Sequence, residues 1–157
     1  MDVRRAIVSD IDAAVGLAER KYRQYQKYQP TFWRKSANSA KSTKAFFGEL
    51  LDAEDTVFLV ATEGSQVLGF LIARKLAVPT VYSPGGDTWL IDDFCVAEMH
   101  HWLGIGEALL SHATTLIHEA GAAQIVVVCG ERDLAKAEML RRSDLTIASS
   151  WWTKPLE

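Results

Sequence analysis

Hydrophobic and polar positions along the chain follow two different periods. Between residues 105 and 120 apolar side chains recur every three or four positions, which predicts an amphipathic helix, and Gly121 predicts its end. Short apolar runs predict strands, and Glu63-Gly64-Ser65 between two of them predicts a hairpin. The predicted order is strand 3–8, a helix capped by Ser9 or Asp10 and running to about Gln26, helix 39–51, strands 56–62 and 66–76, central strand 89–97, helix 105–120, strand 124–129, helix 133–142 and strand 145–153.

Length and composition are those of one globular domain with a substantial core. The chain has 157 residues, of which 48% are hydrophobic and 24% charged. No stretch approaches the ~20 consecutive apolar residues that a membrane span requires, and residues 1–5 lack the apolar region of a secretory signal. We therefore expect residues 1–157 to form a single domain that acts in the cytoplasm without membrane contact.

Cysteine and histidine usage argues against a disulfide and against a metal site. Cys95 and Cys129 both lie in predicted strands, so we expect buried free thiols, as in a reducing cytoplasm. The two cysteines and four histidines show no zinc-ligand spacing, so no metal is expected.

Charge is concentrated in one segment. Residues 20–44 contain eight basic residues and no acidic ones, and aromatic residues are interleaved with them, although the whole chain has a net charge of −3. Such a mixture can bind phosphates and stack on bases, but a solvated helix face with long side chains over apolar neighbours explains it equally simply. The overall negative charge argues against general nucleic-acid binding, which remains a third alternative.

The most informative segment is the turn between the central strand and the amphipathic helix. Gly104 and Gly106 stand there, just before the helix. This order places free backbone N–H groups and the positive end of a helix dipole where a pyrophosphate can bind. A dinucleotide fingerprint would need a third glycine where Leu109 stands, and the Gly-Lys-Ser/Thr of a phosphate loop is absent.

This turn resembles the cofactor signature of the GNAT superfamily of N-acetyltransferases. The signature reads Arg/Gln-x-x-Gly-x-Gly/Ala, and here the corresponding residues are 101–106, with His101 in place of Arg or Gln. Residues 91–96 resemble the matching strand of the diamine (spermidine/spermine) acetyltransferases, with no gap up to Gly106. The resemblance implies an α/β (α+β) fold with a mixed, mostly antiparallel central sheet, splayed after the fourth strand and flanked by about four helices.

The resemblance also implies acetyl-CoA as co-substrate and names the residues that would bind it. The main chain of the central strand would hold the pantetheine arm, and the glycine turn would hold the pyrophosphate. The strand residues are Phe94, Cys95 and Val96, and the turn residues are His101, Trp102, Leu103, Gly104, Ile105, Gly106 and Glu107.

Acetyl transfer to an amine requires a polarised carbonyl and a deprotonated amine, because an alkylammonium with a pKa of ~10 cannot attack. Asp92 matches a catalytic Glu of the diamine enzymes, so we expect it to act as the base, through a water. The alternative is that it pairs with a structural Arg or a backbone N–H. A strand period of two predicts Asp92 and Asp93 on opposite faces, so that at most one faces the acceptor.

The general acid is missing from its usual place. Many relatives in the superfamily carry a Tyr on the helix after the fifth strand, and that position is Leu140 here. Another tyrosine (Tyr22, Tyr25, Tyr28 or Tyr82) or water could supply the proton. Two functions therefore stay open: an N-acetyltransferase acting on a primary amine of a small molecule or peptide by direct attack in a ternary complex, and an acyl-CoA-binding sensor with little or no turnover.

The end of the chain carries two adjacent tryptophans. Because neighbours on a strand face opposite ways, we expect one of Trp151 and Trp152 to pack inward. The other would line the acceptor pocket or a subunit contact, which makes a homodimer an open expectation.

Overall fold

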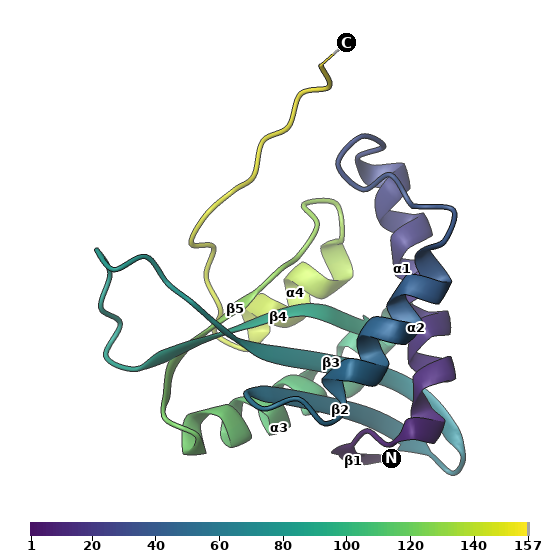
Figure 1. The fold of residues 1–157 in the computed structure, drawn as a ribbon, viewed down its shortest axis with the longest axis horizontal. Coiled ribbons are helices and arrows are strands. Elements are labelled where there is room, and N and C mark those ends of the chain that lie inside the picture. Colours follow the sequence, from purple (N-terminus) through teal and green to yellow (C-terminus); the bar gives the residue numbers. More distant parts are fainter. Residues whose placement is uncertain (157) are drawn as a thin grey trace.

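A five-stranded sheet runs through the middle of the protein, with its strands side by side in chain order (Figure 1). The computed structural model describes residues 1–156. Strands β1 to β4 pair antiparallel and β4 pairs with β5 in parallel, which confirms the predicted mixed, mostly antiparallel sheet. The strands are β1 (Asp2–Arg5), β2 (Thr56–Glu63), β3 (Gln66–Leu76), β4 (Asp87–Val96) and β5 (Ala122–Val127).

Four α-helices cover the two faces of this sheet (Figure 1). One face carries α1 (Ile11–Tyr28) and α2 (Ser39–Leu50), and the other carries α3 (Ile105–Glu119) and α4 (Leu134–Arg142). Short 3-10 helices, Val8–Asp10 and Met99–Trp102, precede α1 and α3. None of the helices in residues 1–156 is both long and apolar enough to cross a membrane.

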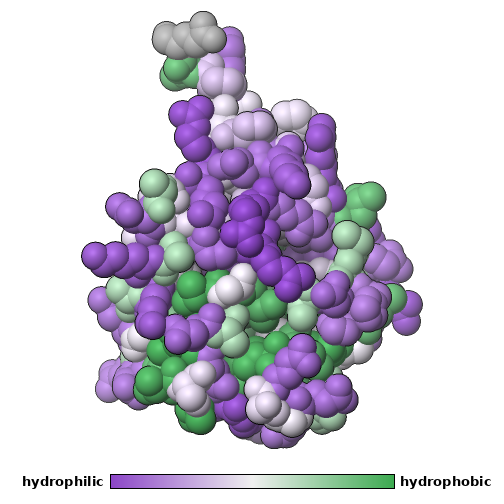
Figure 2. All heavy atoms as spheres, turned by 90° about the vertical axis from the view of Figure 1, so that its right-hand side faces the viewer, coloured by the Kyte–Doolittle hydropathy of each residue, from purple (hydrophilic) through white to green (hydrophobic). Residues whose placement is uncertain are grey.

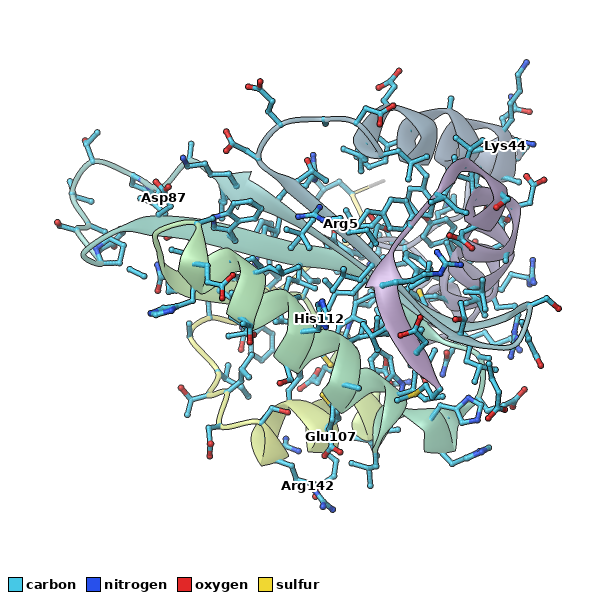
Figure 3. All side chains as sticks on the ribbon, turned by 90° about the horizontal axis from the view of Figure 1, so that it is seen from below. Arg5, Lys44, Asp87, Glu107, His112 and Arg142 are labelled. Carbon is cyan, nitrogen blue, oxygen red and sulfur yellow. The ribbon has the colours of Figure 1, made fainter. Side chains whose placement is uncertain are left out.

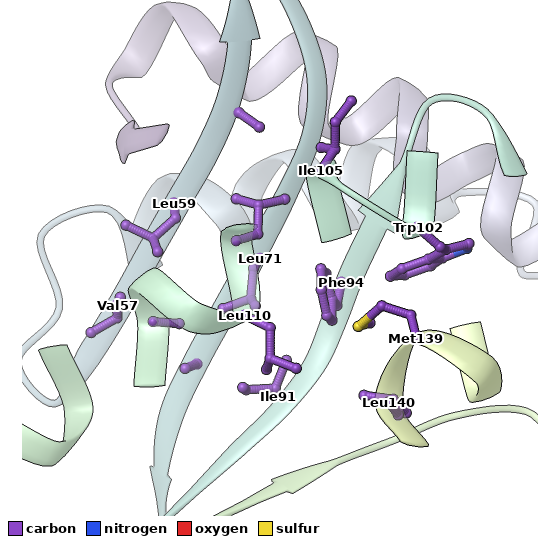
Figure 4. Packing of buried hydrophobic residues seen from close by; sticks show 14 of the residues in the cluster. Val57, Leu59, Leu71, Ile91, Phe94, Trp102, Ile105, Leu110, Met139 and Leu140 are labelled. Atoms are coloured by element: carbon purple, nitrogen blue, oxygen red, sulfur yellow. The ribbon is translucent and has the colours of Figure 1, made fainter. Parts of the chain in front are cut away.

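Each face of the sheet has its own hydrophobic core. The core under α1 and α2 is rich in phenylalanine and includes Phe47, Phe58 and Phe70. The core under α3 and α4 contains Phe94, whose ring packs edge-on against the ring of Trp102, with 4.9 Å between the ring centroids (Figure 4). Met139 and Leu140 of α4 lie beside these two rings, so α4 is anchored where β4 ends (Figure 4).

A β-bulge interrupts β4 at its two aspartates. Leu71 of β3 pairs with Phe94, whereas Ala73 pairs with Ile91, so one extra residue is inserted in β4. Ile91 and Phe94 both lie in the core under α3 and α4, although they are three positions apart. Strict alternation therefore fails between them, so the argument from a period of two, which predicted the two aspartates on opposite faces, does not apply here.

The predicted last strand, residues 145–153, is also wrong. Residues 145–156 form neither helix nor strand and leave the body of the protein beyond α4 (Figure 1). Asp144, with a φ of 63°, turns the chain out of α4. After Leu145, which packs against the core under α3 and α4, only Ile147 is a large apolar residue before the tryptophans, and its side chain is exposed. Trp151 is 87% exposed and Trp152 94% exposed, so neither packs inward as expected.

Candidate active site

Strands β4 and β5 part halfway along β4, as the predicted splay requires. Their pairing runs from Asp87 with Ala122 to Ile91 with Val127, and the N–H of Val128 still donates to the carbonyl of Ile91 at 3.0 Å. Beyond this point residues 94–96 remain paired with β3 alone, and the bulge residues Asp92 and Asp93 have no partner in the register. The main-chain groups of β4 on its β5 side therefore face a gap.

A cavity of about 250 Å³ lies at this gap. Four of the residues predicted to bind the cofactor line it: Phe94, Cys95, Val96 and Trp102. The facing wall comes from α1, a helix that carries none of the residues predicted to bind the cofactor. The cavity thus borders the strand segment whose main chain has lost its partner.

Two basic residues of α1 reach across to the unpaired part of β4. The ammonium of Lys21 donates to the carbonyl of Asp92 at 2.8 Å. The guanidinium of Arg20 donates to the carbonyl of Ala97 and lies 3.7 Å from the carboxylate of Glu98. Both residues belong to the basic segment 20–44, and at these two positions the segment contacts the gap instead of forming only a solvated face. In Figure 2 the face that carries α1 is hydrophilic over its upper half and exposes more apolar side chains below.

The two positions of the turn require glycine for different structural reasons. Gly104 has a φ of 110°, a conformation that side-chain-bearing residues rarely adopt. Gly106 instead makes room for an aromatic ring, because a Cβ there would lie 2.7 Å from the Trp102 ring.

A carboxylate already caps the start of α3. Glu107 accepts a hydrogen bond from the N–H of Gly104 at 3.1 Å, and its other oxygen lies 3.6 Å from the Arg142 guanidinium (Figure 3). A bound pyrophosphate would compete with this carboxylate for the positive end of the helix. Among the other predicted turn residues, Leu103 is exposed and Ile105 is buried in the core under α3. The half-buried ring of His101 lies 4.3 Å from the ring of His100.

The two aspartates of β4 have different environments. Asp92 is exposed, whereas Asp93 is half-buried. Burial, with the nearby charge of Asp92, raises the pKa of the Asp93 carboxyl, and the charges of Lys21 and Arg74 oppose this rise.

None of the four candidate tyrosines is placed as an obvious acid. Tyr25 donates to the Asp133 carboxylate at 2.6 Å and accepts from the N–H of Gly130 at 3.2 Å, and burial raises the pKa of its phenol. It therefore ties α1 to the segment between β5 and α4. Burial also raises the pKa of Tyr22 to about 12, and its hydroxyl lies 3.3 Å from Thr43 Oγ1. Tyr28 accepts from Gln24 and Tyr82 is exposed in the long loop before β4.

Lys136 is a site feature that sequence reasoning missed. Its side chain is fully buried, and burial, followed by the charge of Lys21, lowers the pKa of its ammonium to about 8. The signal was present in the sequence, because Lys136 precedes Met139 and Leu140 by three and four positions and so shares their apolar helix face. Among residues 1–156 no cluster of histidine, cysteine and carboxylate side chains is arranged to hold a metal ion.

The comparisons with known proteins agree with this geometry. The model of the Acetyltransferase (GNAT) family matches residues 19–142. The chain belongs to the GNAT acetyltransferase family. Among curated proteins no sequence matches it.

Solved structures share the fold of this GNAT domain at low sequence identity. A mutant of the BH1408 protein from Bacillus halodurans is similar over 100% of both chains, with a TM-score of 0.85 and 16% identity. A predicted acetyltransferase from Clostridium acetobutylicum, solved with acetyl-CoA, covers 98% of this chain and 95% of its own, with a TM-score of 0.75 and 17% identity. An aminoglycoside N-acetyltransferase in complex with CoA covers 99% and 93%, with a TM-score of 0.73 and 11% identity.

Proposed function

We propose that this GNAT domain transfers the acetyl group of acetyl-CoA to a primary amine of a small molecule or peptide. The amine attacks the thioester directly in a ternary complex. The observation that carries the proposal is the cavity at the point where β4 leaves β5, beside the helix start that follows the glycine turn. Two proteins of the same fold were solved with acetyl-CoA or CoA, which supports this choice of co-substrate.

The residues around the gap fit acetyl-CoA. The unpaired main chain of Phe94, Cys95 and Val96 can hydrogen-bond the amide groups of a pantetheine arm, as a β-strand would. The start of α3 offers backbone N–H groups to a pyrophosphate once the Glu107 carboxylate moves aside. When bound there, acetyl-CoA would supply an activated acetyl group at the widest part of the gap.

The protein's own groups would then assist the attack. A free N–H of the parted strand β4 can stabilise the charge that develops on the carbonyl oxygen. We propose Asp92 as the base that removes the proton of the amine through a water, since it is exposed and follows Ile91, the last residue of β4 that pairs with β5. Asp93 is the second candidate, because its raised pKa brings a carboxylate closer to the working pH of a base.

Location and assembly are part of the same proposal. Cys95 and Cys129 are free thiols, which is compatible with action in the cytoplasm. The exposed Trp151 and Trp152 are candidate contacts for a second subunit.

The sensor alternative differs from the enzyme in one measurable respect. Isothermal titration with acetyl-CoA tests binding, and release of CoA thiol with a panel of amines tests turnover. The enzyme releases thiol faster when a suitable amine is added and stays near background without one. Tight binding with no stimulation by any amine would favour the sensor.

The site of binding is tested by Gly104→Val, which forces a side chain into a φ of 110° and should abolish acetyl-CoA binding. Gly121→Val is the matched control, because Gly121 has a φ of 94° at the opposite end of α3 and equally open surroundings. If both variants fold and bind like the parent, the cofactor site is elsewhere.

A further inference from the structure

One buried charge of this protein has no partner. The ammonium nitrogen of Lys136 is inaccessible, and no donor or acceptor among residues 1–156 lies within hydrogen-bonding distance of it. Burial of an ammonium without a compensating partner is strongly unfavourable. The face of α4 that carries Lys136 would be filled more stably by a methionine or leucine, so stability does not explain this lysine.

The ammonium lies beside the gap between β4 and β5. It stands 5.3 Å from the ring centroid of Phe94 and 5.4 Å from that of Trp102, and both rings line the cavity. The titratable groups near it come from every element around the gap. They are Asp93 and Cys95 of β4, Cys129 beyond β5, Lys21 of α1 and Asp133 at the start of α4.

None of these neighbours neutralises the ammonium. The Asp133 carboxylate accepts from the hydroxyl of Tyr25 at 2.6 Å and from the backbone N–H of Lys136 at 3.4 Å, so it is held by other donors. Burial raises the pKa values of both cysteines, which keeps the two thiols neutral. Lys21 adds a like charge, whereas the charge of Asp133 and the faces of the two aromatic rings favour the cation.

We infer that Lys136 is the proton donor to the sulfur of the departing CoA, in place of the missing tyrosine. This inference rests on the proposed acetyl transfer. Leu140, where the resemblance would put that tyrosine, lies one helical turn after Lys136 on the same face of α4. The ammonium therefore approaches the gap from the same helix and the same side.

The step balances in protons and electrons. As the amine nitrogen bonds to the carbonyl carbon, the C–S bond breaks and its electron pair stays on sulfur. Because the ammonium is inaccessible in the free protein, the step requires the ring of Phe94 or Trp102 to move aside when acetyl-CoA binds. Lys136 then gives one N–H proton to that sulfur and becomes a neutral amine. The proton that the substrate nitrogen loses passes to the base or to water, and water returns a proton to Lys136. A pKa of about 8 lies near the ~8.5 of a thiol, so the transfer is close to thermoneutral.

A readout independent of turnover is the ionisation of bound CoA. The ultraviolet absorbance of its thiolate, titrated against pH, gives the pKa of the bound thiol. A cation next to the sulfur lowers this value by ~1–3 pH units. We expect the midpoint to rise by at least ~1 pH unit in Lys136→Met and to stay unchanged in Lys41→Met, which removes an exposed lysine of α2.

Steady-state kinetics of the variants provide the second test. Lys136→Met should lower kcat by ~10²–10⁴ and leave acetyl-CoA affinity within a few-fold. Lys136→Gln keeps a polar side chain that cannot give this proton, so its kcat should fall by the same factor. With two variants, the test does not depend on the folding of either one. Leu140→Tyr added to Lys136→Met should restore part of the rate, which a merely structural role for Lys136 would not produce.

Two results would overturn the inference alone. The first is normal turnover and an unchanged thiol pKa in both Lys136 variants of a protein that binds CoA. The second is acetylation of Lys136, detected by mass spectrometry after acetyl-CoA is added without amine, because the lysine would then be a nucleophile. A wild-type protein that binds no CoA would refute the proposed function itself.

Discussion

Replacement of Lys136 by methionine should make the free protein more stable. The ordinary pKa of a lysine ammonium is 10.5, and in the folded protein the pKa of Lys136 is about 8. This difference corresponds to a loss of about 3 kcal/mol in the free energy of unfolding at pH 7. Methionine has a similar length and no charge to desolvate. It also forfeits the attraction of the Phe94 and Trp102 rings, worth ~0.5–1 kcal/mol. The net gain in unfolding free energy is therefore about 2 kcal/mol.

This gain has a characteristic dependence on pH. Between pH 8 and pH 10.5 the unfolded chain binds more protons at Lys136 than the folded chain does. The free energy of unfolding of the wild-type protein therefore rises with pH over this range, as far as this group contributes to it. Below pH 8 the penalty is fully present and constant. The advantage of Lys136→Met should therefore be largest at pH 7 and should shrink toward zero by about pH 10.5.

Urea unfolding of both proteins at pH 7, 9 and 10.5, followed by circular dichroism, measures this difference. Lys41→Met serves as the control, since its lysine is exposed on α2. At pH 7 a gain of about 2 kcal/mol corresponds to a melting temperature higher by roughly 4–8 °C for a domain of this size. Lower stability of Lys136→Met at pH 7, or a difference that does not change with pH, would refute the assignment of a buried, unpaired ammonium.

Three further outcomes follow from the site. Asp92→Asn should lower kcat by ~10²–10⁴ with acetyl-CoA affinity preserved. Asp93→Asn should act mainly by raising the stability of the protein at pH 7, because burial penalises the charged form of Asp93. Equal losses of kcat in the pH-rate profiles of the two variants would contradict this. Glu107→Gln should tighten CoA binding a few-fold in calorimetry by removing a competing negative charge worth ~0.3–1 kcal/mol, and weaker binding would argue against a pyrophosphate at this helix start. Gly106→Ala should cost ~1–3 kcal/mol in urea unfolding because its methyl group meets the Trp102 ring, and a neutral result would show that the ring can move.

Local patterns predicted most of the elements but not their irregularities. The period of three to four in α3 and the glycines at its start, Gly104 and Gly106, were sufficient to locate the helix start, because both signals lie within one short segment. The same method failed at Asp92 and Asp93, where an inserted residue resets the alternation that the argument assumed. It also failed for residues 145–153, which pair with no strand of the sheet; the ring of Trp151 lies 6.4 Å from that of Phe32, and Trp152 is exposed.

The non-local part of the site was beyond sequence reasoning for a different reason. Lys21 looks like an ordinary surface lysine, and the helix period of α4 indicates only that Lys136 shares an apolar face. The approach of α1 and α4 to the gap is what gives both lysines their environments. The resemblance located the strand and the turn, since these carry a fixed motif. It gave no information on charged residues from elements that the motif does not include.

The bulge in β4 also bears on how such a domain can lose its site during evolution. Loss of one residue from most strands would turn every later side chain to the wrong face of the sheet. Loss of Asp92 or Asp93 would not, since Ile91 and Phe94 would then be two positions apart and would still share a face. The deletion would straighten β4, because a bulge adds local twist and bend. A single in-frame deletion of one codon would thus leave a well-packed GNAT fold and remove a candidate catalytic carboxylate and the local distortion of the strand beside the cavity.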